Sequence, residues 1–384
     1  MRITKVSAAL TAIALVAGAA SAFAELQIEH ATVATIKPDN GHRLYIADMF
    51  PPAHAVDSKI RIIDGDDFSV LGQVTNGSFG NFAISADRKQ IIDATSFFSR
   101  GDHGVRTDVV EYYDTSTLNP TSETILPGKR AMTIGYPVFL VETFGSKYLL
   151  LQNATPASSI SVIDFTTKTV LSEIPTAGCF GIYASPTTAG RFSTLCGDGA
   201  AVTVNFDEKG AETSRKRSEK LFDPDTDALF IAGVSTGAKT IFVSFPGNVH
   251  IIDFSGETAS QEAPWSLLSA KDKAGNWRPG GYGNIAYSQD TKQLYVGMHP
   301  NGEEGSHKTP AAEIWKVDIA KKTVALRAKS DGATYMQVSK EAHPLLFTVN
   351  GRLGSITKYD GDTLKALGSS KKDLLEGGGP IWVE

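Results

Sequence analysis

Seven short β-prone runs, each ending in aspartate, recur along the chain and restrict its fold more than any other feature. The first run ends at Asp64 and the last at Asp360. Successive aspartates are about 49 residues apart on average, a spacing typical of propellers and solenoids. The runs are Arg61–Asp64, Glu111–Asp114, Ser161–Asp164, Val204–Asp207, His250–Asp253, Trp315–Asp318 and Thr357–Asp360. This regularity indicates one structural unit that is repeated seven times.

Each repeat is predicted to contain four short strands. In the third repeat, Lys147–Leu151 precedes the run that ends at Asp164, and Lys168–Ile174 follows it. Turns of Gly, Asp, Asn and Ser separate such runs, which is typical of an antiparallel sheet. The sequence therefore predicts an all-β fold, a seven-bladed β-propeller of four-stranded antiparallel blades, in preference to an open sandwich with repeats by chance. Ala31–Ile36 and Pro380–Val383 are expected to complete one shared sheet that closes the ring.

The N-terminus has the composition of a secretory signal peptide. Arg2 and Lys5 precede an apolar stretch, and Ala22-Phe23-Ala24 provides a small-residue cleavage site. We expect residues 1–24 to be the signal peptide and residues 25–384 to be a single propeller domain. The apolar stretch is too short for a membrane span, so an exported soluble protein without a membrane anchor is expected.

The two cysteines, Cys179 and Cys196, are predicted to form a disulfide, because an exported protein meets an oxidising environment. A metal site is the alternative, although neither cysteine has a histidine or a third cysteine nearby in sequence. The net charge is −5, and Arg215–Arg217 with Lys220 is the basic cluster. This balance does not indicate a nucleic-acid partner.

The longest connections are expected at one end of the propeller, which we interpret as the functional face. One of them, residues 96–107, carries the adjacent pair Phe97 and Phe98 among charged residues. Two phenylalanines on such a face would be costly to leave in water. The pair is therefore expected either to contact a partner or a channel, or to belong to the core.

Two motifs are weighed and set aside. Gly233–Gly237 matches G-x-S-x-G, but Ser235 is expected in a hairpin turn rather than in a strand-to-helix elbow. The loop with His299, Glu303, Glu304 and His307 has no ordinary metal-ligand spacing, so it is interpreted as a surface loop. No catalytic, metal-binding or cofactor-binding residue is expected on this chain.

Five segments of the expected functional face carry a resemblance to a known family: Leu151–Ala157, Cys196–Gly199, Pro264–Leu268, Asn276–Tyr282 and His299–Trp315. They resemble the heavy subunit of the quinoprotein amine dehydrogenases, and are more similar to the aromatic amine branch than to the methylamine branch. The likeness runs through essentially the whole chain after the leader. It implies a periplasmic heterotetramer of two heavy and two light subunits. The light subunit of that family carries tryptophan tryptophylquinone and oxidises a primary amine to an aldehyde and ammonia. Electrons then pass to a blue-copper protein such as azurin or amicyanin.

In that family a heavy-chain phenylalanine narrows the substrate channel. Phe98-Ser99-Arg100, followed by Arg106-Thr107-Asp108, matches the motif of the methylamine branch at this place. The resemblance therefore makes Phe98 the substrate-channel candidate, with Phe97 beside it. The aromatic branch departs from the motif here, which leaves substrate size open. A methylamine dehydrogenase heavy chain and a stand-alone exported binding propeller without redox activity remain the alternatives, and a neighbouring light-subunit gene would discriminate between them.

Overall fold

The computed structural model describes residues 32–49 and 56–383. The chain separates into a unit of residues 1–34 and a unit of residues 35–384, and the second unit holds the strands described below. The expected signal peptide, residues 1–24, lies outside the described residues. Within the described part of the chain, no helix has the length and apolar character needed to cross a membrane.

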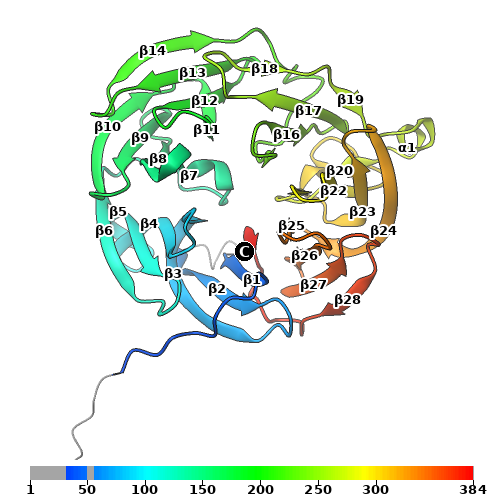
Figure 1. Cartoon of the computed structure of the whole chain (residues 1–384), viewed down its shortest axis with the longest axis horizontal. Helices are drawn as coiled ribbons and strands as arrows, with labels where there is room; N and C mark the ends of the chain where they lie inside the picture. The colour runs from blue at the N-terminus through cyan, green and yellow to red at the C-terminus, as the bar shows by residue number, and fades with distance from the viewer. Residues whose placement is uncertain (1–31, 50–55, 384) are drawn as a thin grey trace, which may run out of the picture. The chain divides into compact units, whose positions relative to one another are not determined.

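The strands of the described residues form six antiparallel sheets, arranged side by side around a common middle (Figure 1). The first sheet has the order β29 (Ile381–Val383), β1 (Arg43–Asp48), β2 (Ser58–Asp64), β3 (Val70–Ile84), β4 (Gln90–Arg100), β5 (His103–Asp114) and β6 (Pro120–Leu126). The second has the order β10 (Thr169–Pro175), β9 (Ser159–Asp164), β8 (Tyr148–Asn153) and β7 (Leu140–Glu142). The third has the order β11 (Cys179–Ala184), β12 (Arg191–Cys196), β13 (Ala201–Phe206) and β14 (Glu212–Arg217).

The remaining three sheets follow in chain order. One comprises β15 (Val234–Ser235), β16 (Thr240–Val243), β17 (Asn248–Asp253) and β18 (Ser260–Gln261), with β19 (Trp265–Ser266) also paired to β17. The next comprises β20 (Arg278–Pro279), β22 (Gln293–His299), β23 (Ala311–Asp318) and β24 (Thr323–Ala333), with β21 (Ile285–Ser288) paired to β22. The last comprises β25 (Tyr335–Val338), β26 (Leu345–Asn350), β27 (Ser355–Asp360) and β28 (Ala366–Ser369). The described helices are α1 (Ala270–Ala274) and the 3-10 turns Pro137–Phe139, Phe144–Ser146 and Ser306–Lys308.

The long strand β3 belongs to two four-stranded groups within the first sheet. Its first half, up to Gly77, pairs with β2. Its second half, from Ser78 to Ile84, pairs with β4. The seven-stranded sheet therefore consists of the group β29-β1-β2-β3 and the group β3-β4-β5-β6. The predicted all-β fold of four-stranded antiparallel sheets is confirmed.

The repeated aspartate closes the turn between the third and fourth strands of a sheet. The Asp164 carboxylate accepts hydrogen bonds from the backbone N–H groups of Thr166 (2.9 Å) and Thr167 (2.7 Å). In the same way, the Asp114 carboxylate accepts hydrogen bonds from the backbone N–H groups of Ser116 and Thr117. Bonds from the Thr167 backbone hold the pKa of Asp164 below its ordinary value. The repeat is therefore a turn signal, because a side chain of this length satisfies the donors of a tight turn.

The C-terminal strand β29 pairs with β1, so the two ends of the strand order meet in one sheet. The C-terminal segment therefore forms a strand as expected, and this strand lies in one sheet with β1. The expected strand at residues 31–36 is wrong for residues 32–36, which have no strand conformation. Ile36 makes a single backbone bond to Ser116 (2.8 Å) instead, and Pro38 two residues later cannot donate to a ladder.

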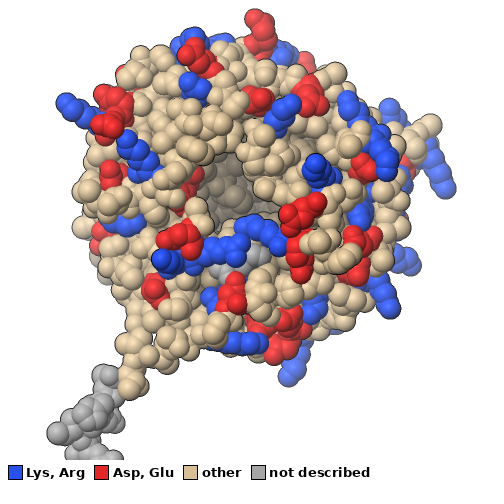
Figure 2. Space-filling view, in the orientation of Figure 1, with Lys and Arg blue, Asp and Glu red and all other residues tan. Residues whose placement is uncertain are grey.

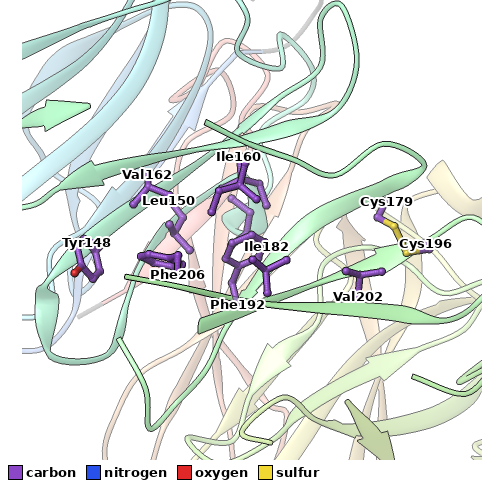
Figure 3. Packing of buried hydrophobic residues seen from close by; sticks show 12 residues of the cluster. Tyr148, Leu150, Ile160, Val162, Cys179, Ile182, Phe192, Cys196, Val202 and Phe206 are labelled. Atoms are coloured by element: carbon purple, nitrogen blue, oxygen red, sulfur yellow. A yellow bond between two sulfur atoms is a disulfide. The ribbon is translucent and has the colours of Figure 1, made fainter. Parts of the chain in front are cut away.

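Apolar side chains of neighbouring sheets form the core. In Figure 3, Leu150 and Ile160 of the β7–β10 sheet pack against Ile182 and Phe192 of the β11–β14 sheet. The Cys179–Cys196 disulfide lies at one end of this cluster and joins directly opposed residues of β11 and β12. The predicted disulfide is therefore present, and it belongs to the packed interface rather than to the surface.

Candidate functional site

Phe97 and Phe98 lie on strand β4, in a hairpin that β4 forms with β5. The expected long loop over residues 96–107 is therefore wrong, because the two strands stay paired almost to the tip. Gly101 and Gly104 at the tip have φ angles of 77° and 105°. Glycine adopts this left-handed region without steric cost, so the chain reverses within a few residues.

The two phenylalanines point to opposite faces of the hairpin, because side chains alternate along a strand. Phe98 is the cross-strand partner of Arg106. Phe97 packs towards the bend of β3, where a Cβ on Gly77 would lie 3.1 Å from its ring. Both rings are half-buried. A path that runs along one face of the hairpin therefore meets one of the two rings, not both.

Arg130 supports the face of the hairpin that carries Phe98. Its side chain is 1% exposed, and its Nε donates to Ser96 Oγ at 2.9 Å. Its terminal nitrogens donate to the backbone carbonyls of Phe79 (2.9 Å), Ala131 (3.1 Å) and Ser78. Burial lowers the pKa of Arg130 to about 10, so its guanidinium stays charged at neutral pH.

Asp108 is the counter-charge of this buried arginine. Its carboxylate accepts two bonds from Arg106, at 2.6 and 2.7 Å. It also accepts from Ser96 Oγ (2.6 Å) and from the Arg130 backbone N–H (3.2 Å). A bidentate pair of this kind is geometrically specific. The network fixes the base of the hairpin, and with it the position of Phe98.

Asp93 lies on the Phe97 side of the same strand and is in a very different environment. It is 0% exposed, and neither carboxylate oxygen has a hydrogen-bond partner among the described residues. Burial raises its pKa well above the ordinary value, and the negative charge of Glu111 adds to this effect against the opposing charge of Arg130. A buried carboxyl group without a partner favours its protonated form.

The tip of the hairpin is exposed to solvent. Asp102 and His103 pair with each other at 2.6 Å, and Val105 is 74% exposed. Asp102 and His103 pair with each other, as charged neighbours in a turn commonly do. Val105 is apolar but exposed, so its side chain does not contribute to the core. The tip therefore offers a small apolar contact to whatever lies beside it.

The other motifs have structural surroundings of their own. Ser235 is exposed on β15, and its Oγ accepts a bond from the Gly237 backbone N–H (3.0 Å), which is a turn contact. His299 is buried on β22, whereas Glu304 and His307 are exposed beyond it. Among the described residues, no group of three or more His, Cys, Asp or Glu side chains is arranged to hold a metal ion.

Sequence reasoning missed Arg130 and Ser96. Arg130 follows Pro127-Gly128-Lys129 in a connecting segment, where a basic pair normally indicates solvent exposure. Its side chain donates to Ser96 and to the Phe79 carbonyl, which are 34 and 51 residues away, so no local pattern could have revealed these two contacts. Asp108 belongs to the matched motif Arg106-Thr107-Asp108, but the sequence did not indicate that it is the buried counter-charge of Arg130.

The fold defines an all-β class of antiparallel four-stranded sheets whose structural neighbours include β-propellers. One neighbour is the β-propeller domain of Cps50 (Swd1) from Myceliophteria thermophila, with a TM-score of 0.55 and 10% identity. The match covers 86% of this chain and 96% of that chain. At this identity the likeness describes the fold alone.

Relatives by sequence are more specific. The family model of the methylamine dehydrogenase heavy chain (MADH) matches residues 40–380. The methylamine dehydrogenase heavy chain of Methylophilus methylotrophus is 25% identical over 90% of this chain and 84% of its own length. That of Paracoccus versutus is 28% identical over 86% of this chain and 77% of its own length. The chain belongs to the methylamine dehydrogenase heavy chain family.

Proposed function

We propose that this chain is the heavy subunit of a periplasmic amine dehydrogenase, and that the complex oxidises a primary amine to an aldehyde and ammonia. The family match over residues 40–380 carries this proposal. In it, the chain assembles as two heavy and two light subunits. Tryptophan tryptophylquinone on the light subunit performs the redox chemistry, and no residue of this chain is assigned to hold it. A blue-copper protein such as azurin or amicyanin receives the electrons.

The role of this chain is then to hold the partner and to shape the path of the substrate. Phe98 is the channel residue in this proposal. It is half-buried on a hairpin that the Arg130 and Asp108 network holds in place. A half-buried ring on a hairpin that is held in place can narrow a path without being part of the packed core.

The proposed substrate is an aromatic primary amine. The resemblance of the Asn276–Tyr282 and His299–Trp315 segments to the aromatic branch supports it, whereas the curated relatives at 25% and 28% identity support methylamine. A comparison of catalytic efficiencies for tyramine and methylamine decides between the two substrates.

We also infer that the sheets are the seven blades of a closed propeller. The support is the division of the first sheet at β3 into two groups of four strands. The pairing of β29 with β1 also supports this inference, because it places the last described strand beside the first. The periplasmic location in the proposal has separate support, since the leader-like N-terminus and the disulfide both fit an oxidising compartment.

Reconstitution of the complex tests the proposed function. The purified chain should neither absorb as a quinone nor oxidise tyramine or methylamine. Co-expression with a light subunit and its maturation genes should give a complex that copurifies, absorbs as a quinone and reduces an artificial electron acceptor. Amine turnover by the isolated chain, or a chain that no light subunit retains, would contradict the proposal. The second result would favour a stand-alone binding propeller.

A further inference from the structure

A cavity of about 250 Å³ lies against the innermost strands. Phe82 of β3, Tyr136 before β7 and Trp382 of β29 contribute aromatic walls, and Pro137, Leu140 and Ile381 contribute apolar ones. The molecular surface is hollowed in the middle, at the place that the inner strands of Figure 1 surround (Figure 2). Phe98 is not among the residues that line the cavity. The cavity is therefore separate from the proposed substrate path.

Glu142, at the end of β7, lines the same cavity and also the hollow next to it, to which Ala86 belongs. Its Oε2 accepts a hydrogen bond from the Ala86 backbone N–H at 2.9 Å. Its Oε1 is buried and has no hydrogen-bond partner among the described residues. One half of the carboxylate is therefore held by the fold, while the other half lacks the partner that a buried oxygen needs.

The neighbouring cations do not supply this partner. Lys168 Nζ lies over the rings of Tyr112 and Phe165, at 3.9 and 3.7 Å. Lys340 Nζ lies 5.3 Å from the centre of the Trp382 ring. Within residues 32–49 and 56–383, no ion pair of Glu142 is formed. Glu142 and Lys168 interact through their charges, because the Glu142 carboxylate opposes the burial that lowers the pKa of Lys168. The cavity thus combines aromatic walls with a carboxylate oxygen that has no hydrogen-bond partner among the described residues.

We propose that this cavity binds a primary ammonium compound with an aromatic body, as a second amine site outside the redox path. The ammonium group donates to Glu142 Oε1, and the ring of the ligand packs between Phe82, Tyr136 and Trp382. A charge-assisted bond of this kind is among the stronger hydrogen bonds. An aromatic wall also attracts the cation directly. The inference goes beyond the proposed function, since it depends on this cavity and not on a light subunit.

Calorimetric titration of the purified chain tests the site. The probe is 2-phenylethylammonium, and its neutral analogue 2-phenylethanol is the comparison. Glu142→Gln retains an oxygen for the Ala86 N–H but removes the negative charge. We expect the ammonium probe to bind the natural chain about tenfold or more tightly than it binds this variant, and the alcohol to show no such difference. Glu304→Gln, an exposed change outside the cavity, should leave binding unchanged.

Trp382→Phe provides a second test that does not depend on Glu142. This variant reduces the aromatic wall and should weaken binding of the ammonium probe, while the folded state is verified by its thermal transition. No heat of binding at up to about 10 mM probe would overturn the site. Equal affinity of the natural chain and Glu142→Gln would overturn it as well. These titrations use the isolated chain, whereas the reconstitution tests the complex with a light subunit. A negative titration therefore does not affect the test of the proposed function.

Discussion

At the scale of single residues, the side chains behind Phe98 differ in character from those behind Phe97. On the Phe98 side, the buried charges of Arg130 and Asp108 are fully hydrogen-bonded. On the Phe97 side, Asp93 is buried without a partner. Removing either Arg130 or Asp108 leaves the other as a buried charge without compensation. Asp93, in contrast, already lowers the stability of the natural protein, because it is buried without a hydrogen-bond partner. The two faces of one hairpin therefore respond differently to substitution.

Phe98→Ala should change amine preference more than stability. Truncation of a fully buried phenylalanine costs about 3–5 kcal/mol, and the half-buried Phe98 should cost about 1–2 kcal/mol on the same scale. We expect the ratio of kcat/KM for tyramine to that for methylamine to change about tenfold in the complex. Phe97→Ala, on the opposite face, is the matched control. An unchanged ratio together with a large fall in Tm would remove Phe98 from the substrate path.

Asp93→Asn should stabilise the protein increasingly as pH rises. Burial raises the folded-state pKa of Asp93 above the ordinary value of 3.8. Between these two values the native state holds a proton that the unfolded chain has released, so the stability of the natural protein falls as pH rises through this window. Asparagine cannot ionise, and its advantage should be small near pH 4 and on the order of 1 kcal/mol or more at pH 8.

Urea unfolding at several pH values measures this effect, with the exposed Asp225→Asn as control. An advantage of Asp93→Asn that stays constant with pH would mean that Asp93 does not titrate in this range.

The burial of Asp93 without a hydrogen-bond partner could not be predicted from the sequence. Asp93 stands in an ordinary β-prone run, and its isolation results from packing between sheets that the sequence does not specify residue by residue.

At the scale of elements, the sequence could predict the features that depend on contacts between residues close together in the chain. The aspartate-closed turns were recognisable because Asp164 and its partners Thr166 and Thr167 are adjacent in sequence. The β4–β5 hairpin was mistaken for a loop because charged residues and glycines suggest irregular structure. Strand pairing supplies its stability instead. Residues 32–36 show the reverse error, since a β-prone composition does not make a strand without a partner strand.

The Cys179–Cys196 disulfide should contribute measurable stability by joining β11 to β12. Its sequence separation is 17 residues, and a loop of this size contributes about 3 kcal/mol in the chain-entropy model. The double substitution Cys179→Ala and Cys196→Ala should therefore lower the free energy of unfolding by about this amount, as measured by urea titration. Thiol titration of the denatured, unreduced protein provides the check. Two reactive thiols would show that the bond does not form in the natural protein.

At the scale of the whole molecule, one carboxylate of the first described strand contacts the segment that precedes the last strand. Asp48, at the end of β1, accepts backbone bonds from Glu376 (2.9 Å), Gly377 (3.1 Å) and Gly378 (2.9 Å). Arg61 also donates to it, at 3.2 Å. These contacts hold the segment that leads into β29. The sequence predicted that the C-terminal strand returns to the start of the chain, but it did not indicate which residue would hold it there.

Asp48→Ala should loosen this closure before the rest of the fold. Three backbone donors lose their acceptor, and each bond to a charged group is worth about 1.5–3 kcal/mol when it is formed. Because the losses share one segment and are not additive, we expect a total of about 3–5 kcal/mol. Exposed Lys371 and Lys372 precede the segment, so limited trypsin digestion should release the C-terminal peptide faster than in the natural protein. Asp225→Ala, which removes an exposed carboxylate elsewhere, should leave the digestion rate unchanged. Equal rates for Asp48→Ala and the natural chain would show that strand pairing alone holds β29 in place.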